Sequence, residues 1–137
     1  MNKNAMGKVW ETWVAEQLRV RGHSVTHLSS KDHSHCDLLV DGILIEVKSA
    51  TPRRIPRQAH SYFVLHSVWK YNKVFNQLYP NFDFLVAVLV LEQPKAFIIP
   101  AIFTTRTMGF CWPTSDKSKR DMRPFYEAWH LITETVR

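Results

Sequence analysis

The feature that most constrains this chain is an Asp41-Gly42 pair between two short apolar runs. Aspartate and glycine tolerate the positive φ angles of a two-residue turn, so the pair predicts a tight β-hairpin. The register that follows from this turn places Asp37 opposite Glu46. Lys48 lies two residues further along, on the same side of the hairpin.

The two sides of the predicted hairpin differ sharply in polarity. One side is an apolar set suited to packing on a helix: Leu38, Val40, Ile43, Ile45 and Val47. On the other side, directly opposed acids about 4.5 to 5.5 Å apart at Cβ repel each other, and a divalent cation would offset that repulsion. Mg²⁺ prefers carboxylate, carbonyl and water oxygens. Lys48 adds a positive charge where an attacked phosphodiester would gather negative charge.

These residues resemble the signature of the PD-(D/E)xK nucleases, in which an acid is followed, after a spacer, by Asp or Glu, any residue, and Lys. Here the match is Asp37 and then Glu46-Val47-Lys48, with Cys36 in place of the proline that often precedes the first acid. The resemblance implies that Asp37 and Glu46 bind Mg²⁺, for which Mn²⁺ should substitute, and that the Val47 carbonyl adds a ligand. It also implies that Lys48 orients the attacking water or stabilises the transition state.

A helix is predicted before the hairpin, between Gly7 and Arg21, with Gly22 as its stop. Its apolar residues recur at helical spacing: Val9, Trp10, Trp13, Val14, Leu18 and Val20. Glu11 and Glu16 fall on opposite borders of that apolar arc. The segment looks like the first helix of archaeal-type Holliday-junction resolvases, where a glutamate shortly after a glycine reaches the metal. That favours Glu11 over Glu16 as a further ligand, the alternative being that both only solvate the helix.

Periodicity and breaker residues predict the other elements. We expect strands at 23–28, 61–66, 82–91 and 95–99, and helices at 68–78 and 121–136. The run at 82–91 should be a strand buried on both faces, with 95–99 as its hairpin partner. At 137 residues the chain is expected to be a single domain, residues 1–137. The expected fold class is α/β: a restriction-endonuclease-like core with a central mixed sheet of about five strands flanked by helices, in α-β-β-β-α-β order.

The charge balance favours a polyanionic partner. Eighteen basic and twelve acidic residues give a net charge of +6, and each basic group placed at a phosphate releases a condensed counterion. A solvated basic face would look similar on charge alone. Coupled to the hairpin site, the charge predicts DNA as the partner, with RNA as an alternative. The candidate contacts are Arg53, Arg54, Arg57, Gln58, Lys70, Lys73, Lys117, Lys119 and Arg120.

Several other classes of site are not favoured. His33, His35 and Cys36 have no second Cys or His pair at the spacing of a structural zinc site. No apolar run approaches 18 residues, so no membrane span is expected. Cys36 and Cys111 are expected to be free thiols. These features predict a cytoplasmic, nucleoid-associated protein.

The sequence therefore predicts a Mg²⁺-dependent DNA endonuclease, a phosphodiester hydrolase that acts as a homodimer. A small chain with this first helix suggests a structure-selective enzyme similar to Holliday-junction resolvases. A sequence-specific restriction or homing-type endonuclease with the same core is the alternative. A hypothesis of a different class is a non-catalytic DNA-binding module that keeps the nuclease scaffold.

Overall fold

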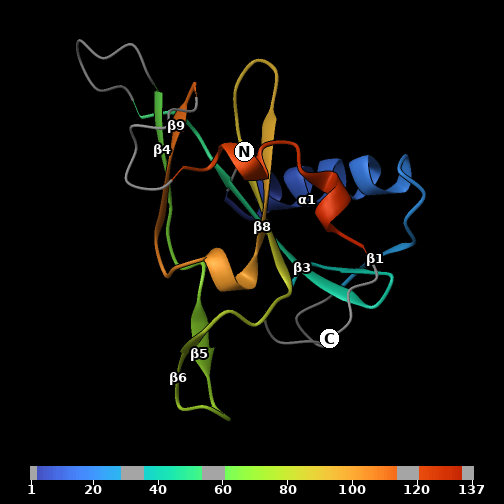
Figure 1. The fold of residues 1–137 in the computed structure, drawn as a ribbon, viewed down its shortest axis with the longest axis vertical. Helices are drawn as coiled ribbons and strands as arrows, with labels where there is room; N and C mark the ends of the chain where they lie inside the picture. Colours follow the sequence, from blue (N-terminus) through green and yellow to red (C-terminus); the bar gives the residue numbers. More distant parts are fainter. Residues whose placement is uncertain (1–2, 29–35, 54–60, 114–120, 134–137) are drawn as a thin grey trace.

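The structure is a computed structural model, and it describes residues 3–28, 36–53, 61–113 and 121–133 (Figure 1). Its centre is a five-stranded mixed sheet with the order β1-β2-β3-β7-β8. The strands are β1 (Val25–His27), β2 (Leu38–Val40), β3 (Ile43–Ala50), β7 (Phe84–Leu89) and β8 (Lys95–Pro100). The expected α/β fold with about five strands in one mixed sheet is confirmed.

The predicted hairpin forms with the predicted register. Leu38 pairs with Ile45 and Val40 with Ile43, and the turn residues Asp41 and Gly42 have φ angles of 49° and 82°. Two successive positive φ angles match the right-handed twist of the flanking strands, which is why Asp-Gly suits this turn. The hairpin thus fixes which side chains of β3 face each side of the sheet.

Helix α1 (Lys3–Arg19) covers one face of the sheet. The backbone N–H of Gly22 donates to the Arg19 carbonyl and that of His23 to the Leu18 carbonyl, which is the pattern that ends a helix at a glycine. Val14, Ala15 and Leu18 are buried against the apolar side of the hairpin. Two residues of the predicted apolar arc, Val9 and Val20, are instead exposed.

The other face of the sheet is covered by a two-stranded ribbon of β4 (Ser61–Leu65) and β9 (Met108–Trp112). Strand β7 is buried along its whole length, as predicted. Its alternate residues Val86 and Val88 join the core beneath α1. Leu85, Ala87 and Leu89 join the core beneath the ribbon. The strand predicted at 61–66 therefore exists, but it lies in the ribbon and not in the central sheet.

The helix predicted at 68–78 is wrong. This segment is a β-hairpin of β5 (Lys70–Asn72) and β6 (Gln77–Tyr79) that projects from the body as an arm. The Asn72 side chain accepts hydrogen bonds from the backbone of Val74 and Phe75 at 2.9 and 3.2 Å, and Asn76 has a φ of 53°. Asparagine forms such turns by bonding the local backbone, which competes with helix formation.

The helix predicted at 121–136 is also wrong over its described part. The chain forms two short 3₁₀ turns there, η2 (Arg123–Phe125) and η3 (Trp129–Leu131), and a third, η1 (Ala101–Phe103), follows β8. Glu127, with a φ of 50°, separates η2 from η3, and its backbone N–H donates to the Ala96 carbonyl on β8. Attachment to the sheet edge overrides the amphipathic pattern.

Among the described residues, no helix is long and apolar enough to span a membrane.

Candidate metal-binding and nucleic-acid site

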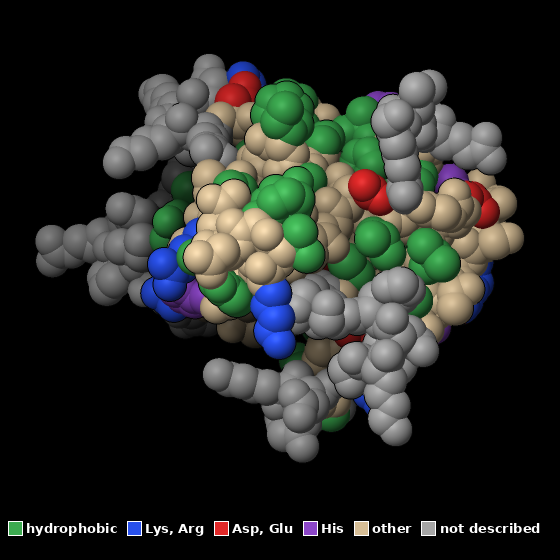
Figure 2. All heavy atoms as spheres, turned by 90° about the horizontal axis from the view of Figure 1, so that it is seen from below, with side chains coloured by type: hydrophobic (Ala, Val, Ile, Leu, Met, Phe, Trp, Pro, Cys, Tyr) green, Lys and Arg blue, Asp and Glu red, His purple; other side chains and the backbone are tan. Residues whose placement is uncertain are grey.

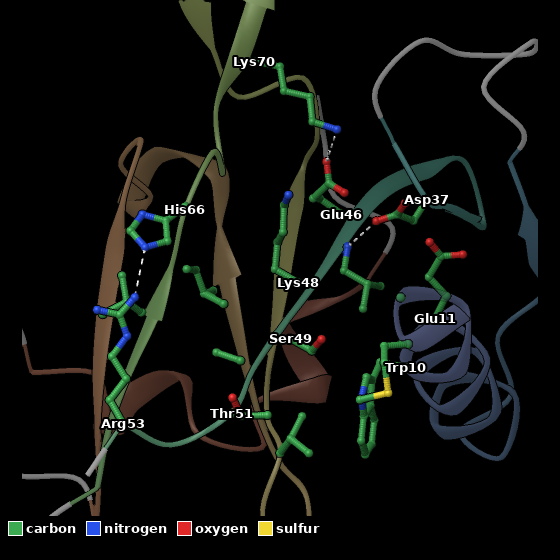
Figure 3. A pocket seen from close by; sticks show the side chains of 17 residues that line it. Trp10, Glu11, Asp37, Glu46, Lys48, Ser49, Thr51, Arg53, His66 and Lys70 are labelled. Carbon is green, nitrogen blue, oxygen red and sulfur yellow. Dashed lines mark hydrogen bonds and ion pairs between the residues drawn. The ribbon is translucent and has the colours of Figure 1, made fainter. Parts of the chain in front are cut away.

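Three carboxylic acids from three segments meet beside the hairpin. Glu11 comes from α1, Asp37 directly precedes β2, and Glu46 lies on β3. Asp37 stands between the other two (Figure 3). Its Oδ2 accepts a hydrogen bond of 2.7 Å from the backbone N–H of Val47, which fixes the carboxyl group against β3.

The electrostatics of this group are unfavourable without a cation. Burial raises the pKa of Glu46 to about 9, and its hydrogen bond to Asp37 and the charge of Asp37 add to the rise. Burial also raises the pKa of Glu11 to about 7, followed by the charge of Asp37 and a hydrogen bond to it. Only 3% of Glu46 is exposed. Desolvation and like charges both disfavour ionised carboxylates, so a positive charge is needed to ionise Glu11 and Glu46 beside Asp37.

Two lysines supply positive charge at this point. Lys48 lies on β3 and extends toward Glu46, as predicted for the same side of the hairpin (Figure 3). Lys70, at the start of β5, places its Nζ 3.9 Å from Oε2 of Glu46. Both lower the pKa of Glu46, and the effect of Lys70 is the larger. The sequence indicated Lys70 only as a DNA contact on a helix, and nothing in its spacing from the hairpin indicated a neighbour of Glu46.

The acids and lysines line an open cleft of about 720 Å³. Arg53 and His66 stand across from the acids, with Nη2 of Arg53 3.4 Å from Nε2 of His66. Several further residues line this cleft that the sequence does not mark as functional, because each reads as ordinary strand, loop or core: Trp10, Ser49, Thr51 and His66. The cleft therefore has an acidic floor next to α1 and a basic opposite side.

The remaining predicted residues divide into three groups. Val47 is buried on the helix side and offers only its backbone to the cleft. Lys73 is exposed in the turn of the β5–β6 arm. Glu16 is exposed and pairs with Arg19 at 3.2 Å, so Glu11 is the helix glutamate in the cleft. Outside the described residues lie Arg54, Arg57, Gln58, Lys117, Lys119 and Arg120.

The donor chemistry of the site fits a hard divalent cation, since carboxylate and carbonyl oxygens are what Mg²⁺ prefers. Within the described ranges, no group of three or more His, Cys, Asp and Glu side chains could hold an ion as the side chains stand. Burial and the neighbouring Asp37 instead favour the protonated forms of Glu11 and Glu46. Ion binding therefore requires loss of the Glu11 and Glu46 protons and a reorientation of the carboxyl groups.

Comparison with known proteins bears on the fold. No protein-family model matches the chain, and no curated protein matches it either. Among solved structures it is similar to a bacterial homing endonuclease, I-Ssp6803I, with a TM-score of 0.68 and 22% sequence identity. The match covers 96% of this chain and 93% of that one. The chain thus has an α/β fold that is shared with a solved endonuclease.

Proposed function

We propose that this chain is a Mg²⁺-dependent DNA endonuclease that hydrolyses phosphodiester bonds. The observation that carries the proposal is the meeting of Glu11, Asp37 and Glu46 at one side of an open cleft. A purely structural role does not account for it, because like charges gathered away from water oppose folding unless they are neutralised. A divalent cation would provide that neutralisation, and the cleft leaves room for a substrate beside it.

The proposed ligands are the carboxylates of Asp37 and Glu46, with Glu11 binding directly or through water and the Val47 carbonyl adding a further oxygen. Bound there, the ion would polarise a phosphate oxygen and make water a stronger acid. Because Val47 N–H already holds one oxygen of Asp37, the other oxygen stays available to the ion. The hydrogen bond keeps this carboxylate in place while Glu11 and Glu46 adjust.

The lysines take separate roles in this proposal. Lys48 orients the attacking water or stabilises the charge that develops on the phosphate. Lys70, 3.9 Å from Glu46, favours the ionised form of that carboxylate and so prepares it as a ligand. Arg53 across the cleft and Lys73 on the arm contact the phosphate backbone, which positions the nucleic acid without reading its sequence.

DNA as the substrate is supported by the net charge of +6 and by the likeness to a protein described as a homing endonuclease. The likeness favours a sequence-specific, homing-type enzyme as much as a structure-selective one that acts on four-way junctions. Both kinds of enzyme would use the same cleft, and they would differ in whether the loops around it recognise a DNA sequence or a DNA structure.

A cleavage assay tests the proposal. The substrates are a four-way junction, a pool of random-sequence linear duplexes and single strands, each with Mg²⁺ and with a chelator. We expect cleavage that needs Mg²⁺, and Lys48→Ala should slow it by about 100-fold or more while the fold is retained. Lys95 lies on β8 and packs over Trp112 of β9. It offers a matched control, since Lys95→Ala should leave the rate unchanged.

Normal cleavage by both Lys48→Ala and Glu46→Ala would place the active site elsewhere. Calorimetry distinguishes the proposed nuclease from a non-catalytic DNA-binding module that keeps the nuclease scaffold. A protein that cuts none of these substrates and takes up no Mn²⁺ in a manner that depends on Asp37 would be a scaffold without the proposed activity.

A further inference from the structure

The net positive charge of the chain comes from one stretch, residues 47–82. This stretch contains no Asp or Glu and six basic residues: Lys48, Arg53, Arg54, Arg57, Lys70 and Lys73. The other twelve basic residues of the chain equal its twelve acidic residues in number. The stretch ends with the β5–β6 arm, so the arm belongs to the part of the chain that attracts a polyanion most strongly.

The arm has the form of an element that fits a groove of DNA. It is a two-stranded antiparallel ribbon that projects from the body (Figure 1). Figure 2 views the molecule from the end at which the arm projects, and it shows apolar and uncharged side chains in the middle of this face with basic side chains along their border. The major groove of DNA admits a two-stranded β-ribbon, and each base pair presents a distinct pattern of donors and acceptors there.

One face of the arm is polar and begins at the metal-site cleft. Lys70 pairs with Tyr79, and Asn72 pairs with Gln77. Directly paired residues share a face, as do residues two apart along a strand, so these four side chains lie on the same face. Lys70 places its Nζ 3.9 Å from Oε2 of Glu46. Polar side chains therefore extend from the acidic group along the ribbon.

Two amide side chains of the arm hold its turn in place. The Asn72 side chain, which bonds to the backbone of the turn, also donates from Nδ2 to Oδ1 of Asn81 at 2.7 Å. The Tyr71 hydroxyl donates to the side chain of Asn76. These bonds fix the ribbon before it meets a partner, which lowers the entropic cost of binding.

Gln77 and Lys73 are exposed and remain available to a ligand. Among the residues that the structure describes, the Gln77 amide has no hydrogen-bond partner and the Lys73 ammonium has no acidic partner. Gln77 also lines a second cleft of about 720 Å³ between the arm and η1, which leaves open space beside it. A glutamine amide can bond to N6 and N7 of adenine in the major groove, and an ammonium suits a phosphate.

We propose that the β5–β6 arm enters the major groove of DNA, where Gln77 recognises an adenine and Lys73 contacts a phosphate. The inference rests on the proposed function and makes the target of the nuclease a DNA sequence. Asn72, the partner of Gln77, lies about 7 Å along the strand from Lys70, and the Lys70 side chain spans the rest of the way to Glu46. Base pairs stack about 3.4 Å apart, so the adenine should lie about two to five base pairs from the phosphate at the cleft.

Selection of DNA by binding tests this proposal. The probe is a pool of linear duplexes with a randomised central segment, bound without divalent ions and then sequenced. We expect the wild type to enrich adenine at a fixed position, and Gln77→Ala to reduce that preference by about tenfold or more. Gln77→Glu should change the preferred base at the same position to cytosine, because a carboxylate accepts a hydrogen bond from N4 of cytosine.

The matched control is Gln93→Ala, which removes an exposed glutamine from the turn between β7 and β8, at the other end of the molecule (Figure 1). It should select the same sequences as the wild type. Lys73→Ala should weaken binding to all duplexes alike and lower the slope of log K against log salt by about one, without changing the preferred base.

Three results would overturn the proposal: no enriched base in the wild type, the same enrichment in both Gln77 variants, or a Gln77→Ala protein that binds every sequence equally more weakly. Cleavage of the selected duplex with Mg²⁺ is measured separately. Selection that depends on Gln77 without cleavage would support the role of the arm and remove the nuclease activity. Cleavage without such selection would keep the nuclease activity and remove the role of the arm.

Discussion

At the scale of single residues, the behaviour of Glu46 follows from its burial. Burial of this carboxyl group, which is 3% exposed, and the neighbouring Asp37 raise the pKa of Glu46 to about 9. The nearby Lys70 and Lys48 reduce this effect without removing it. Glu46 therefore weakens the metal-free fold as it ionises.

Replacing Glu46 with Gln should stabilise the metal-free protein at alkaline pH. The folded-state pKa of Glu46, about 9, lies above its ordinary value of 4.5, so its contribution to stability is complete below about pH 4.5 and is lost as the pH rises toward 9. Glutamine mimics the protonated form and avoids this loss. Urea denaturation with a chelator present should show Glu46→Gln more stable at pH 9 by at least about 1.4 kcal/mol, the equivalent of one pKa unit.

The control for this experiment is Glu16→Gln, at an exposed position of α1. It should change the free energy of unfolding by less than about 0.5 kcal/mol at any pH. A Glu46→Gln protein that is less stable than the wild type at pH 9 would show that the carboxylate is already neutralised by its lysine neighbours.

At the scale of elements, local signals predicted the site better than they predicted the fold around it. The Asp41-Gly42 turn fixes the register of β2 and β3, and alternation along β3 then separates Glu46 from the apolar side. The turn and the alternation both act between residues that lie within ten positions of each other in the sequence. The helical period narrowed the candidate acid of the first helix to two glutamates, Glu11 and Glu16, because the apolar arc has two borders.

The errors arose where tertiary contacts or turn chemistry override periodicity. An amphipathic pattern at 68–78 also suits a hairpin, and the bonds of Asn72 to the local backbone select the turn. At the C-terminal part of the chain, the backbone of Glu127 bonds to β8 and the helix does not form. Lys70 could not be assigned to the neighbourhood of Glu46 from the sequence, because its position there depends on the β5–β6 arm.

The hairpin turn gives a prediction at this scale. Gly42 has a φ of 82° and open space where a Cβ would lie, so Gly42→Ala should cost only the conformational penalty, about 1 to 2 kcal/mol. Gly7 also has open space around it but lies within α1. Gly7→Ala should therefore stabilise the protein by up to about 1 kcal/mol. Chemical denaturation of both variants measures the difference, and equal effects would contradict the role given to the turn.

At the scale of the whole molecule, charged side chains gather around one cleft. The basic Arg53, Lys48 and Lys70 border the acidic group there. The chain shares its fold with a solved homing endonuclease over 96% of its length.

The salt dependence of duplex binding tests the proposed interaction with a polyanion. Duplex binding should weaken as salt increases, because each phosphate contact releases a counterion. Arg53, exposed at the rim of the cleft, should account for one contact, so Arg53→Ala should lower the slope of log K against log salt by about one. Arg106, on the loop before β9, serves as the control, since Arg106→Ala should leave the slope unchanged. Equal slopes for wild type and Arg53→Ala would remove Arg53 from the interface.

The proposed activity requires that three acids from α1 and the hairpin form one ion site. The direct measurement is anomalous diffraction from a crystal soaked in Mn²⁺ at pH 8, for the wild type and for Asp37→Asn. We predict one Mn²⁺ peak between the carboxylates of Glu11, Asp37 and Glu46 in the wild type, absent from the variant. No peak at these residues in the wild type, or an equally strong one in Asp37→Asn, would rule out an ion site formed by these three acids.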